Sequence, residues 1–79
     1  MRMETANRKF IFNLKISQEE YASYYRGEKN MVLATATNGR RIRFPAAILR
    51  RFLTHNGIRG TFEMVIDQNN RFLNLRKID

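Results

Sequence analysis

Apolar and polar residues alternate in part along the segment from Lys9 to Ile16, with Ile11 as the one apolar residue on the otherwise polar face. Such a period of two is typical of a β-strand with one buried face. The apolar face consists of Phe10, Phe12, Leu14 and Ile16. Ser17 and Glu20 follow with the spacing of a capping box, in which the hydroxyl accepts a backbone N–H and the carboxylate reaches back to the cap. The pattern therefore predicts a strand over 9–16 and a helix over about 18–26 that Gly27 ends.

A β-hairpin is predicted in the middle of the chain. The segment from Asn30 to Thr37 is rich in β-branched and apolar residues, and apolar groups on both faces are typical of a central strand. Asn38-Gly39 favours a type I′ turn, because both residue types tolerate positive φ. The next strand, 40–44, carries Ile42 and Phe44 on one face and Arg41 and Arg43 on the other.

The remaining pattern predicts a second helix and two more strands. Pro45 suits the first turn of a helix, where its missing N–H is not needed, so we expect a helix over about 46–54. Alternation predicts a strand over 61–66. A polar run that is typical of a turn separates it from a last strand over 71–78. The resulting order is β-α-β-β-α-β-β.

This order predicts an α+β fold: a small single domain with a twisted, mostly antiparallel five-stranded sheet and two short helices. Two points stay open, namely whether the sheet closes into a barrel and whether the connection over 17–29 forms one parallel pair. With 79 residues, of which 43% are hydrophobic, the chain has room for one core. We expect residues 1–7 to be a flexible N-terminal tail and residues 8–79 to form the domain.

The composition excludes several classes of chemistry. Without cysteine there are no disulfides, thiolate metal sites or thiol nucleophiles. Small secreted domains usually need disulfides, so we expect a cytoplasmic protein, and no apolar run reaches the length of a membrane span. His55 is the only histidine, and the phosphate-binding motif G-x-x-x-x-G-K-[ST] does not occur. We therefore predict a protein that is not an enzyme and has no metal or other cofactor.

Charge changes this picture more than any motif does. The net charge is +8, and between Glu28 and Glu63 there are seven cations and no acidic residue. Like charges this close repel one another in the folded state, so we expect an anionic partner. The candidate anion-binding residues are Arg40, Arg41, Arg43, Arg50, Arg51 and Arg59. Arginine suits phosphate because its planar guanidinium donates two parallel hydrogen bonds.

Arg41 and Arg43 form the centre of this candidate site. They project from one face of a predicted strand, about 6–7 Å apart, which is comparable with the phosphate spacing along a nucleic-acid strand. The alternative interpretation is a solvated strand face whose arginine stems cover apolar surface.

Two further features favour structural interpretations. The segment Gly57-Ile58-Arg59-Gly60 has the spacing of the loop with which KH domains grip nucleic-acid backbone, but here it joins a helix to a strand. We expect Gly57 to cap the preceding helix in a left-handed conformation. Tyr24 and Tyr25 are candidates for stacking on bases, but packing between helix and sheet is the favoured role.

Four segments resemble one family of short bacterial proteins. They are Phe10-Ile11-Phe12-Asn13-Leu14-Lys15-Ile16-Ser17, Tyr21-x-x-Tyr24-Tyr25-x-Gly27, Gly39-Arg40-Arg41-Ile42-Arg43-Phe44-Pro45-Ala46 with Leu49-Arg50, and Thr54-His55-x-Gly57-Ile58-x-Gly60-x-Phe62-Glu63. Together they extend over nearly the whole chain and are similar to an uncharacterised family that is classed as a domain of unknown function. The resemblance implies a stand-alone bacterial protein of this length. It implies no activity, ligand or catalytic residue.

The leading hypothesis is a non-enzymatic module that binds nucleic acid through backbone phosphates with weak sequence specificity. Arg40, Arg41 and Arg43 are expected to form the central contact, with the other three candidate arginines beside it. The alternative is a protein–protein interaction or homodimerisation module, which would pair through a sheet edge or through an apolar patch around Phe72 and Ile78. DNA, RNA and an acidic protein all stay open as polyanionic partners.

Overall fold

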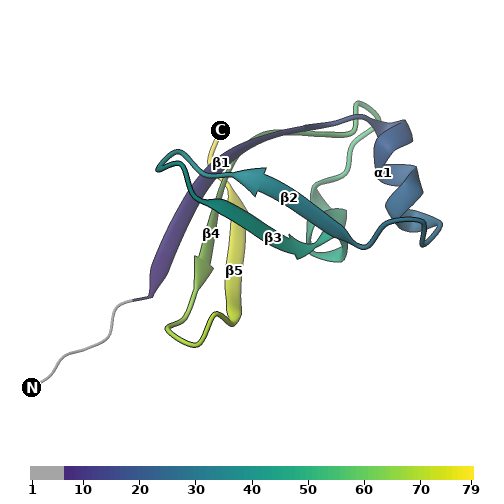
Figure 1. Ribbon diagram of the computed structural model, residues 1–79. Helices are drawn as coiled ribbons and strands as arrows, with labels where there is room; N and C mark the ends of the chain where they lie inside the picture. Colours follow the sequence, from purple (N-terminus) through teal and green to yellow (C-terminus); the bar gives the residue numbers. More distant parts are fainter. Residues whose placement is uncertain (1–6) are drawn as a thin grey trace, which may run out of the picture.

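The structure, a computed structural model, describes residues 7–79. The N-terminal tail expected over 1–7 therefore lies outside the described residues, apart from Asn7. Five strands and two short helices follow one another along the chain (Figure 1). They are β1 (Arg8–Ile16), α1 (Gln18–Tyr25), β2 (Met31–Thr35), β3 (Arg41–Pro45), the 3₁₀-helix η1 (Ala46–Phe52), β4 (Ile58–Ile66) and β5 (Phe72–Lys77).

The strands form two antiparallel sheets, so the expectation of one five-stranded sheet is wrong. One sheet has the order β1-β4-β5, and the other is the two-stranded ribbon β2-β3. The ribbon meets the larger sheet at a single antiparallel bridge between Phe12 and Ala36 and then crosses in front of it (Figure 1). Every pairing among the described strands is antiparallel, and the sheet is not closed.

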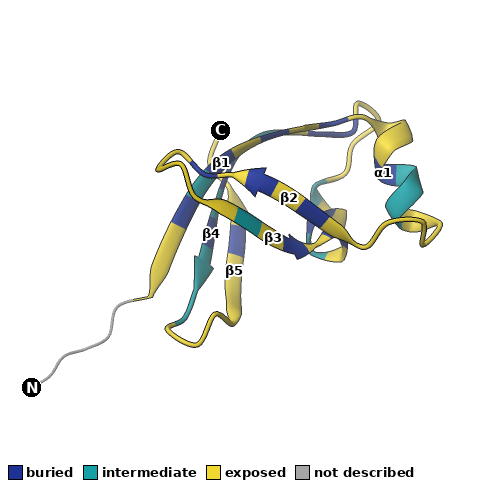
Figure 2. Cartoon of the chain, in the orientation of Figure 1, coloured by how far each residue is buried: buried dark blue, intermediate teal, exposed yellow. Residues whose placement is uncertain are grey.

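The core lies between the inner face of the larger sheet and the ribbon with η1. The apolar face predicted for β1 is confirmed, because Phe10, Phe12, Leu14 and Ile16 are all buried. Each faces a β4 residue across nine consecutive pairs from Arg8–Ile66 to Ile16–Ile58. Figure 2 shows the buried positions gathered where the ribbon covers the sheet, while the ends of β1 and β5 nearest the β4–β5 turn are exposed.

Helix α1 begins as the capping box predicts. The Ser17 hydroxyl accepts from the amide of Glu20 at 3.0 Å, and the Glu20 carboxylate accepts from the amide of Ser17 at 3.1 Å. Tyr21 is the buried residue of the helix, and its hydroxyl donates to the carbonyl of Ala46 at 3.0 Å. This bond connects α1 with the start of η1, and burial raises the pKa of the Tyr21 phenol.

The β2–β3 hairpin differs from the sequence expectation in two ways. Gly39 has φ +88°, but Asn38 does not have positive φ, so the turn is not type I′. The Gly39 amide donates to the Ala36 carbonyl at 2.9 Å, which makes a three-residue connection that ends in a left-handed glycine. Strand β2 is not central either, because its outer face is open and Leu33 is 61% exposed.

The C-terminal half departs from simple alternation at two places. The second helix is a 3₁₀-helix that ends at Phe52, two residues before the expected end, with the Leu53 amide donating to the Arg50 carbonyl. In β5, Ile66 pairs with Phe72 and Val65 pairs with Asn74, so Leu73 is an extra residue on its strand. This β-bulge explains why Leu73 is 48% exposed although Leu75 is fully buried.

Candidate anion-binding surface

The three central arginines of the sequence analysis line one hollow. It lies between the ribbon, the start of β1 and the end of β4, and it has a volume of about 270 Å³. We call it the ribbon hollow, and its lining residues are Arg8, Phe10, Arg40, Arg41, Ile42, Arg43, Met64, Ile66 and Asn70. The lining combines four apolar side chains with four arginines and one amide, and none of the lining residues is acidic.

Two elements bring these arginines together. In β3, Arg41 and Arg43 are exposed and alternate with the more buried Ile42 and Phe44, as the strand period requires. Their cross-strand partners in β2 are Thr35 and Leu33, so no carboxylate faces them across the ribbon. Arg40 precedes the strand at the end of the turn, where its amide donates to the Asn38 side chain at 3.0 Å.

Arg8 is a lining residue that the sequence reasoning missed. It begins β1, pairs with Ile66 across β4, and donates a hydrogen bond to the Asn70 side chain in the β4–β5 turn. The alternation of β1 carried the signal, because Arg8 lies two residues before Phe10 and therefore shares the inward face. An arginine on the apolar face of a strand end is positioned to reach into the hollow that this end borders.

Arg50 and Arg51 line a second hollow, between η1 and β5. It measures about 570 Å³, and we call it the helix hollow; its lining residues are Ala47, Ile48, Arg50, Arg51, Phe72 and Asn74. Arg51 donates to the carbonyl of Leu75 and lies 4.6 Å from the ring centroid of Phe52. Arg50 donates to the hydroxyl of Tyr25 and lies 4.6 Å from its ring centroid. Both arginines therefore connect η1 to its neighbours and carry charge at the hollow.

Arg59 lies apart from the other candidates. It pairs with Lys15 across β1 and β4 and borders a separate hollow that Glu20 also lines. Gly57, which we expected to cap the second helix, lies instead in a turn with Thr54, whose amide donates to the Gly57 carbonyl at 2.9 Å. A Cβ on Gly57 would overlap the Ile16 carbonyl oxygen, so this glycine allows a close backbone approach.

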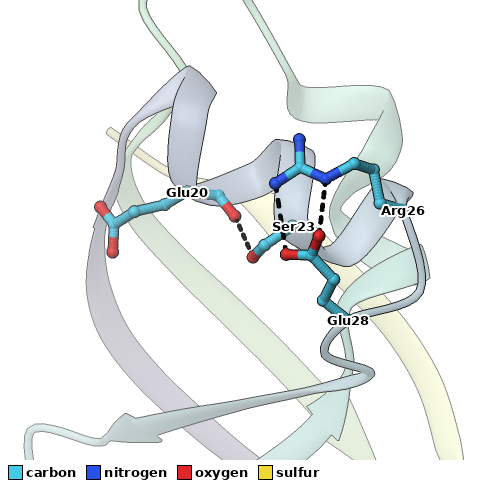
Figure 3. Close-up of polar contacts among 4 residues, drawn as sticks. All are labelled: Glu20, Ser23, Arg26 and Glu28. Atoms are coloured by element: carbon cyan, nitrogen blue, oxygen red, sulfur yellow. Dashed lines mark hydrogen bonds and ion pairs between the residues drawn. The ribbon is translucent and has the colours of Figure 1, made fainter.

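Two glutamates of residues 7–79 form ion pairs with arginines, and none of these four residues lines either hollow. Glu28 accepts from Arg26 at 2.8 Å beside the end of α1 (Figure 3). Glu63 accepts from Arg76 at 2.9 Å, and strand alternation directs it to the face opposite Phe62. In each pair the arginine hydrogen bond holds the pKa of the carboxyl below its usual range. These two acids therefore stay charged and are already neutralised by other arginines.

Two further acids accept hydrogen bonds within their own turns. The Glu20 carboxylate belongs to the capping box of α1, and the Asp67 carboxylate accepts from the amides of Asn69 and Arg71 at 2.8 Å. No ion pair in the described part of the chain joins an acid to any of the six candidate arginines. The two hollows are therefore bordered by guanidinium groups that carboxylates of residues 7–79 do not neutralise.

The arrangement of these groups defines the class of this protein: a small α+β domain with two arginine-bordered hollows. Within residues 7–79, no group of three or more His, Cys, Asp or Glu side chains could hold a metal ion. No helix in that range is long and apolar enough to cross a membrane.

The chain belongs to the family described as "Protein of unknown function (DUF2835)", whose family model matches residues 8–78. This finding confirms the resemblance to a domain of unknown function. Comparisons with curated proteins and with solved structures give no match.

Proposed function

We propose that this protein is a non-enzymatic, cytoplasmic module that binds nucleic acid through its backbone phosphates. The observation that supports the proposal is the ribbon hollow, which four arginines line together with apolar side chains and without any acidic residue. Guanidinium groups in that setting attract phosphate by charge and hold it by paired hydrogen bonds. Arg40, Arg41 and Arg43 make the central contact, and Arg8 joins them.

The flanking arginines contribute unequally to this proposal. Arg50 is exposed beside the helix hollow, and its stacking on Tyr25 leaves other guanidinium donors for a phosphate. Arg51 already donates to the Leu75 carbonyl, so it serves mainly to hold η1 on β5. Arg59 lines neither of these hollows and borders a separate one with Glu20, so the proposed contact does not contain it.

The electrostatic part of the binding has a calculable signature. If the four arginines of the ribbon hollow each neutralise one phosphate, log affinity falls against log salt with a slope of about −3 for single strands and −3.6 for duplexes. Replacing Arg41 and Arg43 together by glutamine reduces the number of neutralised phosphates from four to two. The slope then becomes shallower by about 1.4–1.8, and affinity at 0.1 M salt falls by about 25- to 60-fold.

The test is fluorescence anisotropy with labelled 20-nucleotide DNA and RNA probes at several salt concentrations. The double variant Arg41→Gln/Arg43→Gln is compared with Arg26→Gln/Arg76→Gln, which removes the same charge from positions outside both hollows. We expect the first variant to lose affinity and slope as calculated, and the second to stay within a few-fold of wild type. Equal losses in the two variants, or no binding to any probe at low salt, would refute the proposal.

A second function, homodimerisation, has its own supporting observation. The apolar residues Phe72 and Leu73 in β5, and Ile78 directly after it, are each at least 39% exposed, and β5 is an edge strand. Edge strands with exposed apolar side chains pair readily with another copy. Sedimentation at several protein concentrations, with and without nucleic acid, distinguishes the two functions. A stable dimer that ignores polyanions would favour the second.

A further inference from the structure

The two hollows have no lining residue in common, but apolar residues that line them are neighbours on one face of the larger sheet, and we call this pair of residues the apolar floor. Ile66 lines the ribbon hollow and Phe72 lines the helix hollow, and these two residues are cross-strand partners in β4 and β5. Arg8 is the partner of Ile66 on the other side, in β1. Cross-strand partners point to the same face of a sheet, so arginine, isoleucine and phenylalanine form one row across three strands, about 10 Å long.

Phe72 is the exposed ring of this floor. It is 44% exposed, whereas Phe10, Phe12 and Phe62 are buried in the core. The exposure follows from the fold, because Phe72 begins β5, next to the bulge at Leu73, and the end of β5 nearest the β4–β5 turn is exposed (Figure 2). A single exposed phenylalanine is ordinary, but this one lines a hollow together with two arginines.

We infer that the nucleic acid bound here is single-stranded, with a base on Phe72 and phosphates on the arginines of the ribbon hollow; this inference rests on the proposed function. The helix hollow, which Phe72 lines, has a volume of about 570 Å³, within the range of pockets that hold small organic groups, and the ribbon hollow, at about 270 Å³, is slightly smaller than that range. A single strand can turn unstacked bases onto an aromatic ring while its backbone follows a line of cations.

A duplex fits the same surface less well. Its bases are stacked and paired inside, so an apolar floor would meet only sugar and phosphate and would gain nothing from burial. A single strand makes both kinds of contact, and base stacking on an aromatic side chain strengthens binding by about 5- to 150-fold per base. The floor therefore selects for the single strand, while the arginines act on both forms.

The test uses a 12-nucleotide oligothymidine, the duplex that it forms with oligoadenosine, thymidine monophosphate and poly-glutamate as probes. At 200 mM salt we expect the single strand to bind at least 10-fold more tightly than the duplex and the other two probes. Phe72→Ala should weaken the single strand about 5-fold or more with no change of salt slope, and should leave the duplex unchanged. Phe72→Leu, which keeps an apolar group but removes the ring, should lose most of the same affinity.

Ile78→Ala is the matched control, because Ile78 is also exposed, at 39%, but lines neither hollow. Circular dichroism of each variant reports whether it folds. If Phe72→Ala binds the single strand as wild type does while Arg41→Gln/Arg43→Gln loses binding, this inference fails and the proposed function stands. Equal affinity for duplex, monophosphate or poly-glutamate also overturns the inference. If the wild-type protein binds no nucleic acid at low salt, both this inference and the proposed function are overturned.

Discussion

Replacing Gly57 by alanine tests how the turn before β4 is packed. Gly57 is buried with φ +88°, and an added Cβ would overlap the Ile16 carbonyl oxygen and lie 2.9 Å from the Gln18 amide nitrogen. These are backbone atoms at the junction of β1 and α1, so they cannot rotate away as a side chain could. Gly27 provides the control, because it has φ +78° and nothing within 4 Å of its added Cβ.

The expected loss of unfolding free energy has contributions that both glycines share and one that applies to Gly57 alone. A left-handed conformation costs alanine about 1–2 kcal/mol, and this applies to both glycines. The entropy that alanine removes from the unfolded chain also applies to both, so it cancels in the comparison. Overpacking against fixed atoms adds about 1–3 kcal/mol at Gly57 alone. Strain and overpacking at Gly57 together cost about 2–5 kcal/mol, and the unfolded-chain entropy offsets only about 0.4–1 kcal/mol of this. The remainder is a large part of the roughly 4–12 kcal/mol available to a domain of 79 residues.

Urea denaturation followed by circular dichroism measures both variants. We expect Gly57→Ala to lose about 1–3 kcal/mol more unfolding free energy than Gly27→Ala. Its folded fraction should bind nucleic acid as wild type does, because Gly57 borders neither the ribbon hollow nor the helix hollow. Equal destabilisation of the two variants would refute the packing argument. A Gly57→Ala protein that is fully stable but no longer binds would show instead that the glycine loop grips phosphate.

Three further predictions concern two contacts outside the hollows. Tyr21→Phe removes the hydrogen bond to the Ala46 carbonyl, so we expect a loss of about 1–2 kcal/mol in thermal denaturation, and an unchanged midpoint would contradict it. Since burial raises the pKa of Tyr21, wild type should also lose stability above about pH 10, and the variant should lose less. The Arg76 hydrogen bond lowers the pKa of Glu63, so its stabilisation is present above the ordinary carboxyl pKa and is lost as pH falls below about 4. Urea denaturation at pH 5 and pH 3 should therefore show a smaller acid loss for Glu63→Gln than for wild type; equal losses would contradict the assignment.

Predictions from the sequence were most accurate where structure depends on near neighbours. The alternation of β1 correctly gave its buried face, because successive strand residues point to opposite sides whatever the partner strand is. The capping box of Ser17 and Glu20 formed as predicted, since both of its hydrogen bonds join residues three apart. The hairpin was predicted correctly at Gly39. Its turn type was predicted wrongly, because Asn38 tolerates positive φ but does not require it.

The candidate site could be predicted only in part. Alternation placed Arg41 and Arg43 on one face of a strand, as the structure shows. The separation of Arg59 from the others, and the structural contact of Arg51 with Leu75, could not be predicted because they depend on which strands pair. Arg8 joins the hollow through partners more than fifty residues away, and the local pattern does not specify those partners.

The sequence by itself determined the strands, the helix start, the family, the excess of positive charge and the lack of thiol chemistry. Backbone preference, side-chain period and charge are properties of single residues and their near neighbours, so they can be read along the chain. Tertiary structure alone decided that the strands divide into two sheets, that Phe72 is exposed at the start of β5, and that apolar residues paired across β4 and β5 line two arginine-bordered hollows. These features depend on strand pairing over long sequence separations, where many registers satisfy the same local pattern and only packing of the whole core selects one.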